Sequence, residues 1–493
     1  MTRKLIFLVS LFVAALSTSS SSLGQGAGAD DGKQPVKKNP GVKVVTEPLA
    51  VEVKRRDERT DEQLRKELVT VREIGFMQVE TTAIYEKWKA GGAKVKVLSS
   101  SLGPEFFKEY RGEQFFALPW IMEPDCTVGD ESAKLMHDLS TRLRVHLRAS
   151  VPANNTRPDP EKLKDLLAKD PQSKEWKTPQ AIPTLTQMLQ AENTPIRLVL
   201  VEMLGEIKGK EASVALAMRA LFDLSPEVRE KAIEALSFRP VEEYRQTLLD
   251  GLRYPYWTAA ADHAAEAIAA LRLTSAVPDL VTMLKQPAPE LPVKMPVKPP
   301  KKSGPGQPVK EENKYVRYEL VRINHLNNCL LCHPPSLAKD DLIRGRIPMP
   351  FEDPPPQYYG GNAASDLFVR ANTTYLKQNF SVVQPVANNG KWAANQRYDY
   401  LLLTKTLTPR EATLYQMLDG KEYVAVPLGG AGIEGVKQLK LLEKMGDLPI
   451  TYPQRESVLF ALRQLTKKDS GSSASAWEKE LSGSIDALKP DKP

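Results

Sequence analysis

The clearest pattern in the chain is a set of apolar positions at helical spacing between residues 179 and 286. Three similar stretches place Leu204, Leu236 and Ile268 at equivalent positions, with 32 residues between successive members. Alanines around these positions allow helices to approach closely. One amphipathic helix cannot bury its apolar stripe alone, so we expect pairs of helices to stack into a continuous core.

This segment resembles the HEAT-repeat family in its short, bacterial-type form. The stretches that carry the resemblance are residues 181–185 (AIPTL), 225–229 (SPEVR) and 276–280 (AVPDL). The resemblance implies an α-solenoid over residues 176–286, with a face that binds a protein or peptide. It names no particular partner, because one fold serves many functions. The alternative is an ordinary helical bundle with accidental similarity.

Weaker apolar periodicity predicts further elements on both sides of the repeats. We expect residues 59–175 to be mostly helical, without matching a fold that we can name, and residues 361–482 to form a small mixed region. The patterns predict helices over residues 61–90, 132–147, 410–418, 454–465 and 476–481, and short strands within residues 369–386. The predicted class is therefore mainly α.

Three segments lack periodicity and separate the predicted domains. Residues 25–58 are rich in Gly, Lys, Pro and Asp, and we expect them to be a disordered leader. Residues 287–313 are rich in Pro and Lys, which favours a semi-rigid linker in the polyproline II conformation. Residues 483–493 are expected to be a loose tail.

The N-terminus has the order of a secretory signal peptide. Arg3 and Lys4 precede an apolar run over residues 5–16, and small residues follow up to Gly24. The apolar run is too short to span a bilayer as a helix. We therefore expect residues 1–24 to be removed and the mature chain to be periplasmic or extracellular, without a transmembrane anchor. The alternative is a retained N-terminal anchor.

Composition narrows the possible functions. The net charge of +7 falls to +5 without Arg3 and Lys4, and the basic residues are scattered, so we expect no nucleic-acid partner. Three cysteines in 493 residues are too few for a disulfide scaffold. The chain lacks the hydrolase, phosphate-loop, zinc-protease and dinucleotide signatures. We expect a binding protein rather than an enzyme, with no catalytic residues, although an enzyme site in an unassigned region stays a weaker alternative.

A candidate chemical site follows the linker, within residues 314–360. Cys329, Cys332 and His333 are spaced as C-x-x-C-H, the attachment pattern of c-type haem. Two thiols three residues apart on a helical turn can each form a thioether to the same porphyrin, and the next residue then places an imidazole under the iron. We therefore expect one covalent haem c, with Cys329 and Cys332 as its attachment points and His333 as an iron ligand.

The same segment resembles c-type cytochromes. This resemblance implies electron transfer with a protein redox partner and haem attachment outside the cytoplasm. Residues 315–327, just before the motif, resemble the first helix of a cytochrome c fold. Met349 lies on a proline-flanked loop and is a candidate sixth iron ligand. Other possibilities stay open: simple packing of Met349, an empty sixth position, or ligation by a residue elsewhere, the candidates being His325, Met417 and Met445.

Two other uses of the close thiols stay open. A disulfide between Cys329 and Cys332 would leave a non-catalytic scaffold for protein–protein interaction. A zinc site would need His325 and His333 as further ligands, but adjacent Cys332 and His333 point apart on a helix, which disfavours one tetrahedral ion. We favour an exported HEAT-repeat electron carrier that docks its redox partner through the solenoid.

Overall fold

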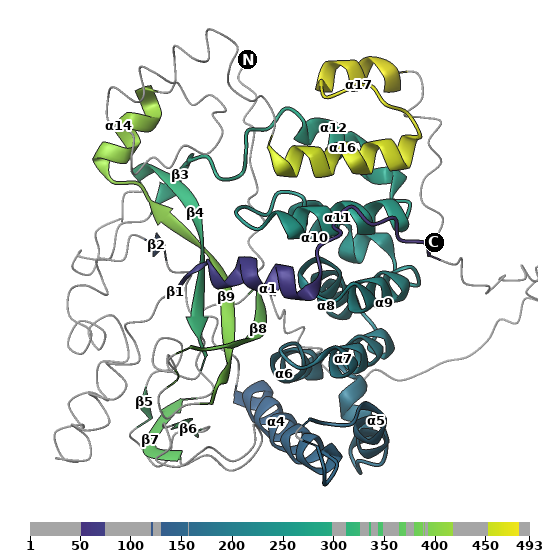
Figure 1. Cartoon of the computed structure of the whole chain (residues 1–493), viewed down its shortest axis with the longest axis vertical. Coiled ribbons are helices and arrows are strands. Elements are labelled where there is room, and N and C mark those ends of the chain that lie inside the picture. Colours follow the sequence, from purple (N-terminus) through teal and green to yellow (C-terminus); the bar gives the residue numbers. More distant parts are fainter. Residues whose placement is uncertain are drawn as a thin grey trace, which may run out of the picture. The chain divides into compact units, whose positions relative to one another are not determined.

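The computed structural model describes most of the repeat region and parts of the remaining chain. The described residues are 51–73, 120–121, 130–155, 157–297, 312–325, 335–336, 344–348, 364–370, 379–387, 389, 393–417 and 452–482. They contain a stack of helices and two β-sheets (Figure 1).

Helices form most of the described chain. The helices up to the first long strand are α1 (Asp61–Val69), α4 (Asp130–Ser150), α5 (Pro160–Ala168), α6 (Ile182–Leu189), α7 (Thr194–Glu206), α8 (Lys210–Phe222), α9 (Pro226–Leu236), α10 (Val241–Gly251), α11 (Thr258–Ala270) and α12 (Val277–Met283). Short 3-10 helices are η2 (Ser173–Lys177), η3 (Pro179–Ala181) and η4 (Thr274–Ala276). The C-terminal helices are α14 (Pro409–Met417), α16 (Pro453–Thr466) and α17 (Ala474–Leu481).

The stacked helices begin with recognisable start signals. The Asn193 side chain caps α7 by accepting the backbone N–H of Ile196 at 3.3 Å, and proline occupies the first turns of both α7 and α9. Leu204, Leu236 and Ile268, the equivalent positions of the 32-residue period, are all fully buried. They lie in α7, α9 and α11. The burial of one equivalent residue in each of these helices confirms the predicted repeat.

Successive helices pack as pairs (Figure 1). Helix α8 contacts α9, α10 and α11, and α7 contacts α9. Helix α16 then packs against α11 and α12, and α17 packs against α12. The C-terminal helices therefore extend the stack, although the strands of the larger sheet lie between α12 and α16 in the sequence.

Within the described residues the larger sheet has six strands, with β4 and β9 at its centre. Its strands are β1 (Arg72–Glu73), β2 (Trp120–Ile121), β3 (Val293–Val297), β4 (Glu312–Asn324), β8 (Phe380–Pro385) and β9 (Asn395–Thr406). Strand β9 pairs antiparallel with β4, from Val316↔Thr406 to Asn324↔Tyr398, and its other edge pairs with β8 and β2. The outer edge of β4 pairs antiparallel with β3 and parallel with β1.

A smaller sheet is described by three antiparallel strands in the order β5-β7-β6, within the residues that the structure covers. These strands are β5 (Pro335–Ser336), β6 (Arg344–Pro348) and β7 (Ala364–Arg370). The strands expected within residues 369–386 are confirmed by β8 and the end of β7. The helices expected over residues 132–147, 410–418, 454–465 and 476–481 are confirmed by α4, α14, α16 and α17.

Helix α1 contacts both the solenoid and the larger sheet. Asp61 accepts from Arg197 of α7 at 3.4 Å, and Arg65 donates to the backbone oxygen of Val383 in β8 at 2.7 Å. Leu64 and Leu68 are fully buried. The helix predicted over residues 61–90 ends at Val69, because the chain enters strand β1 at Arg72 and pairs with β4; residues 74–90 lie outside the described residues.

The helix predicted over residues 315–327 is wrong, because residues up to Asn324 form strand β4. Of the buried apolar residues Val316, Leu320, Val321 and Ile323, all but Val321 have the spacing of a helical face. Strand pairing on both edges overrides that spacing, and the aromatic and β-branched residues of this stretch favour a strand. The cytochrome-like helix before the motif is therefore absent from the described part of the chain.

Two segments predicted to lack structure are partly ordered. Residues 51–58, assigned to the disordered leader, form no helix or strand but bond to Glu230 of α9 and Glu266 of α11. Residues 293–297, assigned to the linker, form β3. Among the described residues β3 pairs only with β4, and a proline is tolerated in a strand whose other edge needs no N–H donor.

In the described part of the chain, no helix combines the length and the apolar character that crossing a membrane would require.

Candidate functional site

The residues predicted to attach haem lie outside the described residues. This holds for Cys329, Cys332 and His333, and also for Met349, the candidate sixth ligand. The structure therefore tests none of these four predictions. Within the described residues, no group of three or more His, Cys, Asp or Glu side chains is arranged to hold a metal ion.

His325 is the last described residue before the C-x-x-C-H motif, and it is hydrogen-bonded to β9. Its backbone N–H donates to the Arg397 oxygen at 2.9 Å, and its Nδ1 lies 2.7 Å from Asp399 Oδ2. Burial alone would raise the pKa of Asp399, but Arg397 and His325 outweigh burial and hold that pKa well below its usual range. The chain therefore enters the motif from a fixed point at the end of β4.

Arg397 joins the larger sheet to the solenoid. Its guanidinium donates to Asp399 Oδ1 at 2.8 Å and to Ser381 Oγ at 2.9 Å, both within the sheet. It also donates to Gln187 of α6, at the side-chain oxygen (2.9 Å) and at the backbone oxygen. Gln190 Nε2 donates to Ser381 Oγ at 3.1 Å. These buried polar contacts fix how β8 and β9 meet the end of α6.

A buried aromatic cluster forms the apolar part of the same contact. The Phe380 ring of β8 stacks on Tyr400 of β9, with ring centroids 4.7 Å apart. On the solenoid side Phe380 stacks on Trp257 at 4.8 Å and on Phe222 at 5.1 Å. Offset stacks of this kind add to the burial of apolar area. The sheet is therefore held on the helices by both an arginine and a phenylalanine.

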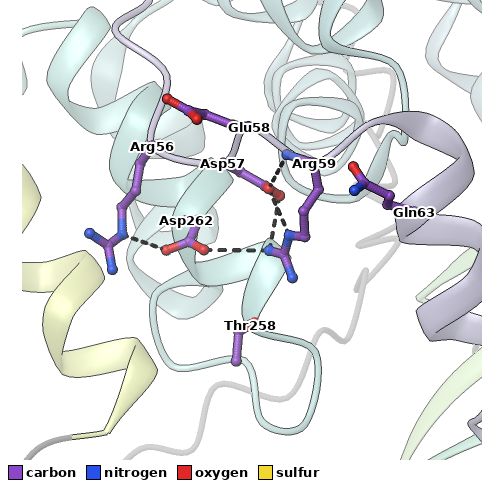
Figure 2. Close-up of a pocket in the computed structure, with 7 residues that line it drawn as sticks. All are labelled: Arg56, Asp57, Glu58, Arg59, Gln63, Thr258 and Asp262. Carbon is purple, nitrogen blue, oxygen red and sulfur yellow. Dashed lines mark hydrogen bonds and ion pairs between the residues drawn. The ribbon is translucent and has the colours of Figure 1, made fainter.

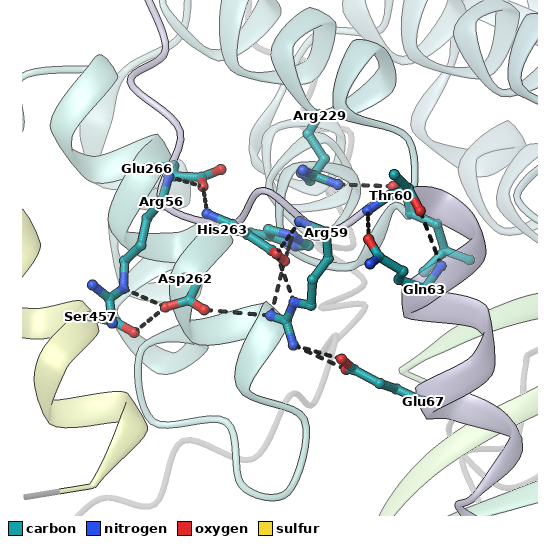
Figure 3. A network of polar contacts seen from close by, with 12 residues as sticks. Arg56, Arg59, Thr60, Gln63, Glu67, Arg229, Asp262, His263, Glu266 and Ser457 are labelled. Carbon is teal, nitrogen blue, oxygen red and sulfur yellow. Dashed lines mark hydrogen bonds and ion pairs between the residues drawn. The ribbon is translucent and has the colours of Figure 1, made fainter.

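A second contact surface lies where residues 51–60, which we call the strap, cross the solenoid (Figure 3). The Arg55 guanidinium bonds to Glu230 of α9 at 2.6 and 2.9 Å. The backbone N–H groups of Arg56 and Asp57 both donate to Glu266 Oε1 of α11, at 2.6 and 2.7 Å. The strap is thus bound through its backbone as well as its side chains, as an extended peptide would be.

A hollow of about 390 Å³ opens between the strap and the start of α11 (Figure 2). Arg56 and Arg59 in its wall both pair with Asp262, at 2.6 and 3.5 Å. Asp262 also accepts from Ser457 Oγ of α16 at 2.6 Å. Because these opposite charges face one another, the hollow presents a balanced polar surface rather than one strong charge.

His263 lies beneath the strap, and its side chain is fully buried. Its partners are Leu221, whose backbone oxygen lies 2.8 Å from Nδ1, and Asp57, whose Oδ2 lies 3.0 Å from Nε2. Burial would raise the pKa of Asp57, but bonds from His263 and Arg59 hold it well below its usual range.

Comparison with known families agrees with the stacked helices. The HEAT repeats family model matches residues 165–237 and 182–269, from the end of α5 through α11. The chain contains HEAT repeats. Searches of curated proteins and of solved structures found no match to this chain. HEAT repeats indicate a scaffold for protein interaction, so the comparison gives the solenoid a role in binding other proteins.

The strap and its partners were missed by sequence reasoning. Asp57 and His263 lie far apart in the chain, and no local pattern connects them. One signal was present in the sequence, because residues 54–58 (KRRDE) are more densely charged than the rest of the predicted leader. Such a charge run is usually a solvated segment, and only the folded structure places it against Glu230 and Glu266.

Proposed function

We propose that this protein is an exported interaction scaffold that carries one covalent haem c and exchanges electrons with a protein partner docked on its HEAT solenoid. The C-x-x-C-H spacing of Cys329, Cys332 and His333 carries the haem part of the proposal. The HEAT repeats support the scaffold part, because stacked helix pairs present extended surfaces to other proteins.

The residues of the motif have the chemistry that haem attachment needs. The thiols of Cys329 and Cys332 would form the thioether bonds, and the His333 imidazole would ligate the iron. Met349 is our candidate for the sixth ligand. A haem bound in this way would accept and release single electrons. The secretory N-terminus supports this assignment, because the resemblance to c-type cytochromes implies attachment outside the cytoplasm.

The described residues next to the motif would position it. Asp399 and Arg397 fix His325 at the end of β4, four residues before Cys329. Arg397 also contacts Gln187 of α6. The attachment segment would therefore begin near the surface where the sheet meets the solenoid. A partner bound to the helices would then be docked on the molecule that carries the redox group.

A second function, favoured by the HEAT repeats alone, is a scaffold without haem. In this alternative Cys329 and Cys332 form a disulfide, which an oxidising compartment permits. The two functions differ in colour and in thiol count. A haem protein absorbs visible light, whereas a disulfide-bonded scaffold is colourless and has two fewer free thiols than cysteines.

The test is the visible spectrum of the mature protein, purified from a host that exports it and matures c-type cytochromes. We expect a pyridine haemochrome spectrum corresponding to about one haem per chain. The double variant Cys329→Ala, Cys332→Ala should lose this haem, whereas the control Cys126→Ala should keep it. A colourless protein, from a host that loads a control cytochrome, would rule out the haem part and leave the scaffold.

A further inference from the structure

Helix α4 lies at one end of the helical stack, where it packs against α5, α6 and η3 (Figure 1). Its residues Leu139, Leu143 and Leu147 are fully buried. The opposite side of the helix is exposed from Lys134 to Arg148. At the rise of an α-helix these fourteen steps cover about 21 Å. The end of the stack therefore presents one long helix side to its surroundings.

The basic side chains of α4 that face the stack have carboxylate partners. Arg142 pairs with Asp138 of its own helix at 3.2 Å, with Asp170 at 3.0 Å and with Glu175. His146 Nε2 lies 2.8 Å from Asp170 Oδ2. Both carboxylates outside the helix come from the segment that follows α5 in the chain. The positive charge on this side is thus matched inside the protein.

The basic side chains on the exposed side have no such partners. Lys134, Arg144 and Arg148, which we call the basic face of α4, form no ion pair within the part of the chain that the structure describes. Asp138 is exposed on the same side, but its carboxylate is already bound within the helix. His137, also exposed there, adds no negative charge. The basic face therefore carries an unmatched positive charge.

Helix stability does not explain the basic face. Arg144 and Arg148 are four residues apart and repel one another, which weakens a helix. The helix dipole favours a cation in the last turn, which accounts for Arg148 but not for Lys134 or Arg144. A negatively charged partner bound along this side would remove the repulsion.

The residues of α4 favour a lipid surface over a protein as that partner. Binding sites for proteins usually depend on aromatic anchors that fill pockets, and α4 contains no Phe, Tyr or Trp. Lipid headgroups are attracted by positive charge alone, and apolar side chains beside the charges can enter the interface. Val145 lies between the two arginines and is 56% exposed. A row of cations along a straight helix also matches a flat surface.

We propose that α4 binds the anionic surface of a lipid membrane through Lys134, Arg144 and Arg148, with Val145 among the headgroups. The protein would lie on the membrane through this helix without spanning it. A basic residue near an anionic surface strengthens binding about fivefold, so the three together supply about a hundredfold. The proposal does not depend on haem.

Cosedimentation of the mature chain with lipid vesicles measures this binding. One set of vesicles is phosphatidylcholine alone, and the other contains about one third phosphatidylglycerol. At low salt we expect partition into the anionic vesicles to be at least about tenfold stronger than into the neutral ones. Raising the salt to about 0.5 M should abolish the difference, because salt screens exposed charges. Equal partition into both sets would overturn the proposal. Binding to neither set would overturn it too and would leave an acidic protein surface as the partner that fits α4.

Variants of the basic face connect the binding to α4. The triple variant Lys134→Ala, Arg144→Ala, Arg148→Ala should lose about a hundredfold in partition into the anionic vesicles. The single variant Arg144→Gln should lose about fivefold. Alanine and glutamine are good helix formers, so both variants should keep the wild-type circular dichroism. Unchanged partition of the triple variant would overturn the proposal.

A matched control separates the basic face from the net charge of the protein. The triple variant Lys231→Ala, Lys285→Ala, Lys468→Ala removes the same charge from α9 and from the segments that follow α12 and α16. These lysines are exposed, but they pair with Glu234, Glu478 and Glu480. The control should bind anionic vesicles like the wild type. An equal loss in the two triple variants would mean that net charge governs binding, which would contradict the proposal.

Discussion

Two glycines within helices show how single residues set the helix spacing in the solenoid. A Cβ atom at Gly251 in α10 would lie 2.5 Å from Leu221 Cδ2 and 3.1 Å from Ala264 Cβ. Leu221 and Ala264 belong to α8 and α11, and both are buried. At Gly205 in α7, a Cβ would meet Ala235 at 4.0 Å, an ordinary contact. Glycine is therefore required at the first position and not at the second.

We predict that Gly251→Ala destabilises the protein by about 1–3 kcal/mol, because the added methyl group overpacks a junction of three helices. Its matched control, Gly205→Ala, should leave stability unchanged or raise it by up to about 1 kcal/mol, because alanine is the better helix former. Urea unfolding followed by circular dichroism measures both. Equal effects of the two substitutions would contradict the packing described for α10.

Residue patterns predict the core of the solenoid well and the contacts between distant segments poorly. Leu204, Leu236 and Ile268 follow from periodicity, because each lies on the apolar face of its own helix. The bond between Asp57 and His263 has no local signal, since the strap and α11 meet only after folding. A charge run in a low-complexity leader therefore gives no indication of the surface that it will contact.

At the scale of elements, the apolar part of the contact between the larger sheet and the solenoid depends on one side chain. Phe380 lies between Tyr400 of the sheet and two solenoid residues, Trp257 and Phe222. It is almost fully buried. Removing its ring would leave a cavity between elements that are distant in sequence, which the surrounding aromatic rings cannot fill without moving.

Phe380→Ala should lower the free energy of unfolding by about 3–5 kcal/mol, the range for a buried phenylalanine. Phe238→Ala is the control, because that ring is exposed at the end of α9 and its loss should change stability by less than about 0.5 kcal/mol. Chemical denaturation compares the two variants. A small effect of Phe380→Ala would mean that the sheet does not dock through this cluster.

The segment that ends at the C-x-x-C-H motif was predicted to be a helix but forms strand β4, and the burial pattern of β4 explains the error. Three of its buried apolar residues, Val316, Leu320 and Ile323, have helical spacing by coincidence. The adjacent Leu320 and Val321 are both buried, so both faces of the strand are covered, and strands pair with both of its edges. A fully covered strand need not alternate. In contrast, α16 lies on the surface of the stack and keeps an amphipathic pattern, so its helix could be predicted from residues 454–465.

At the scale of the whole molecule, the strands of the larger sheet and the helices of the stack alternate along the sequence. Helix α16 packs on α11 and α12, although the strands from β3 to β9 lie between these helices in the chain. The sheet meets the solenoid through Arg397 and Phe380, and the strap covers part of α9 and α11. The solenoid therefore already binds segments of its own chain, and a partner would use surfaces that these segments leave exposed.

The most direct test of the proposed function is the intact mass of the mature protein, secreted by a host that matures c-type cytochromes and measured under denaturing conditions. We predict the mass of the chain without residues 1–24 plus one covalently bound haem. A mass equal to that of the polypeptide alone, or lower only by the two hydrogens lost in a disulfide, would contradict the haem assignment.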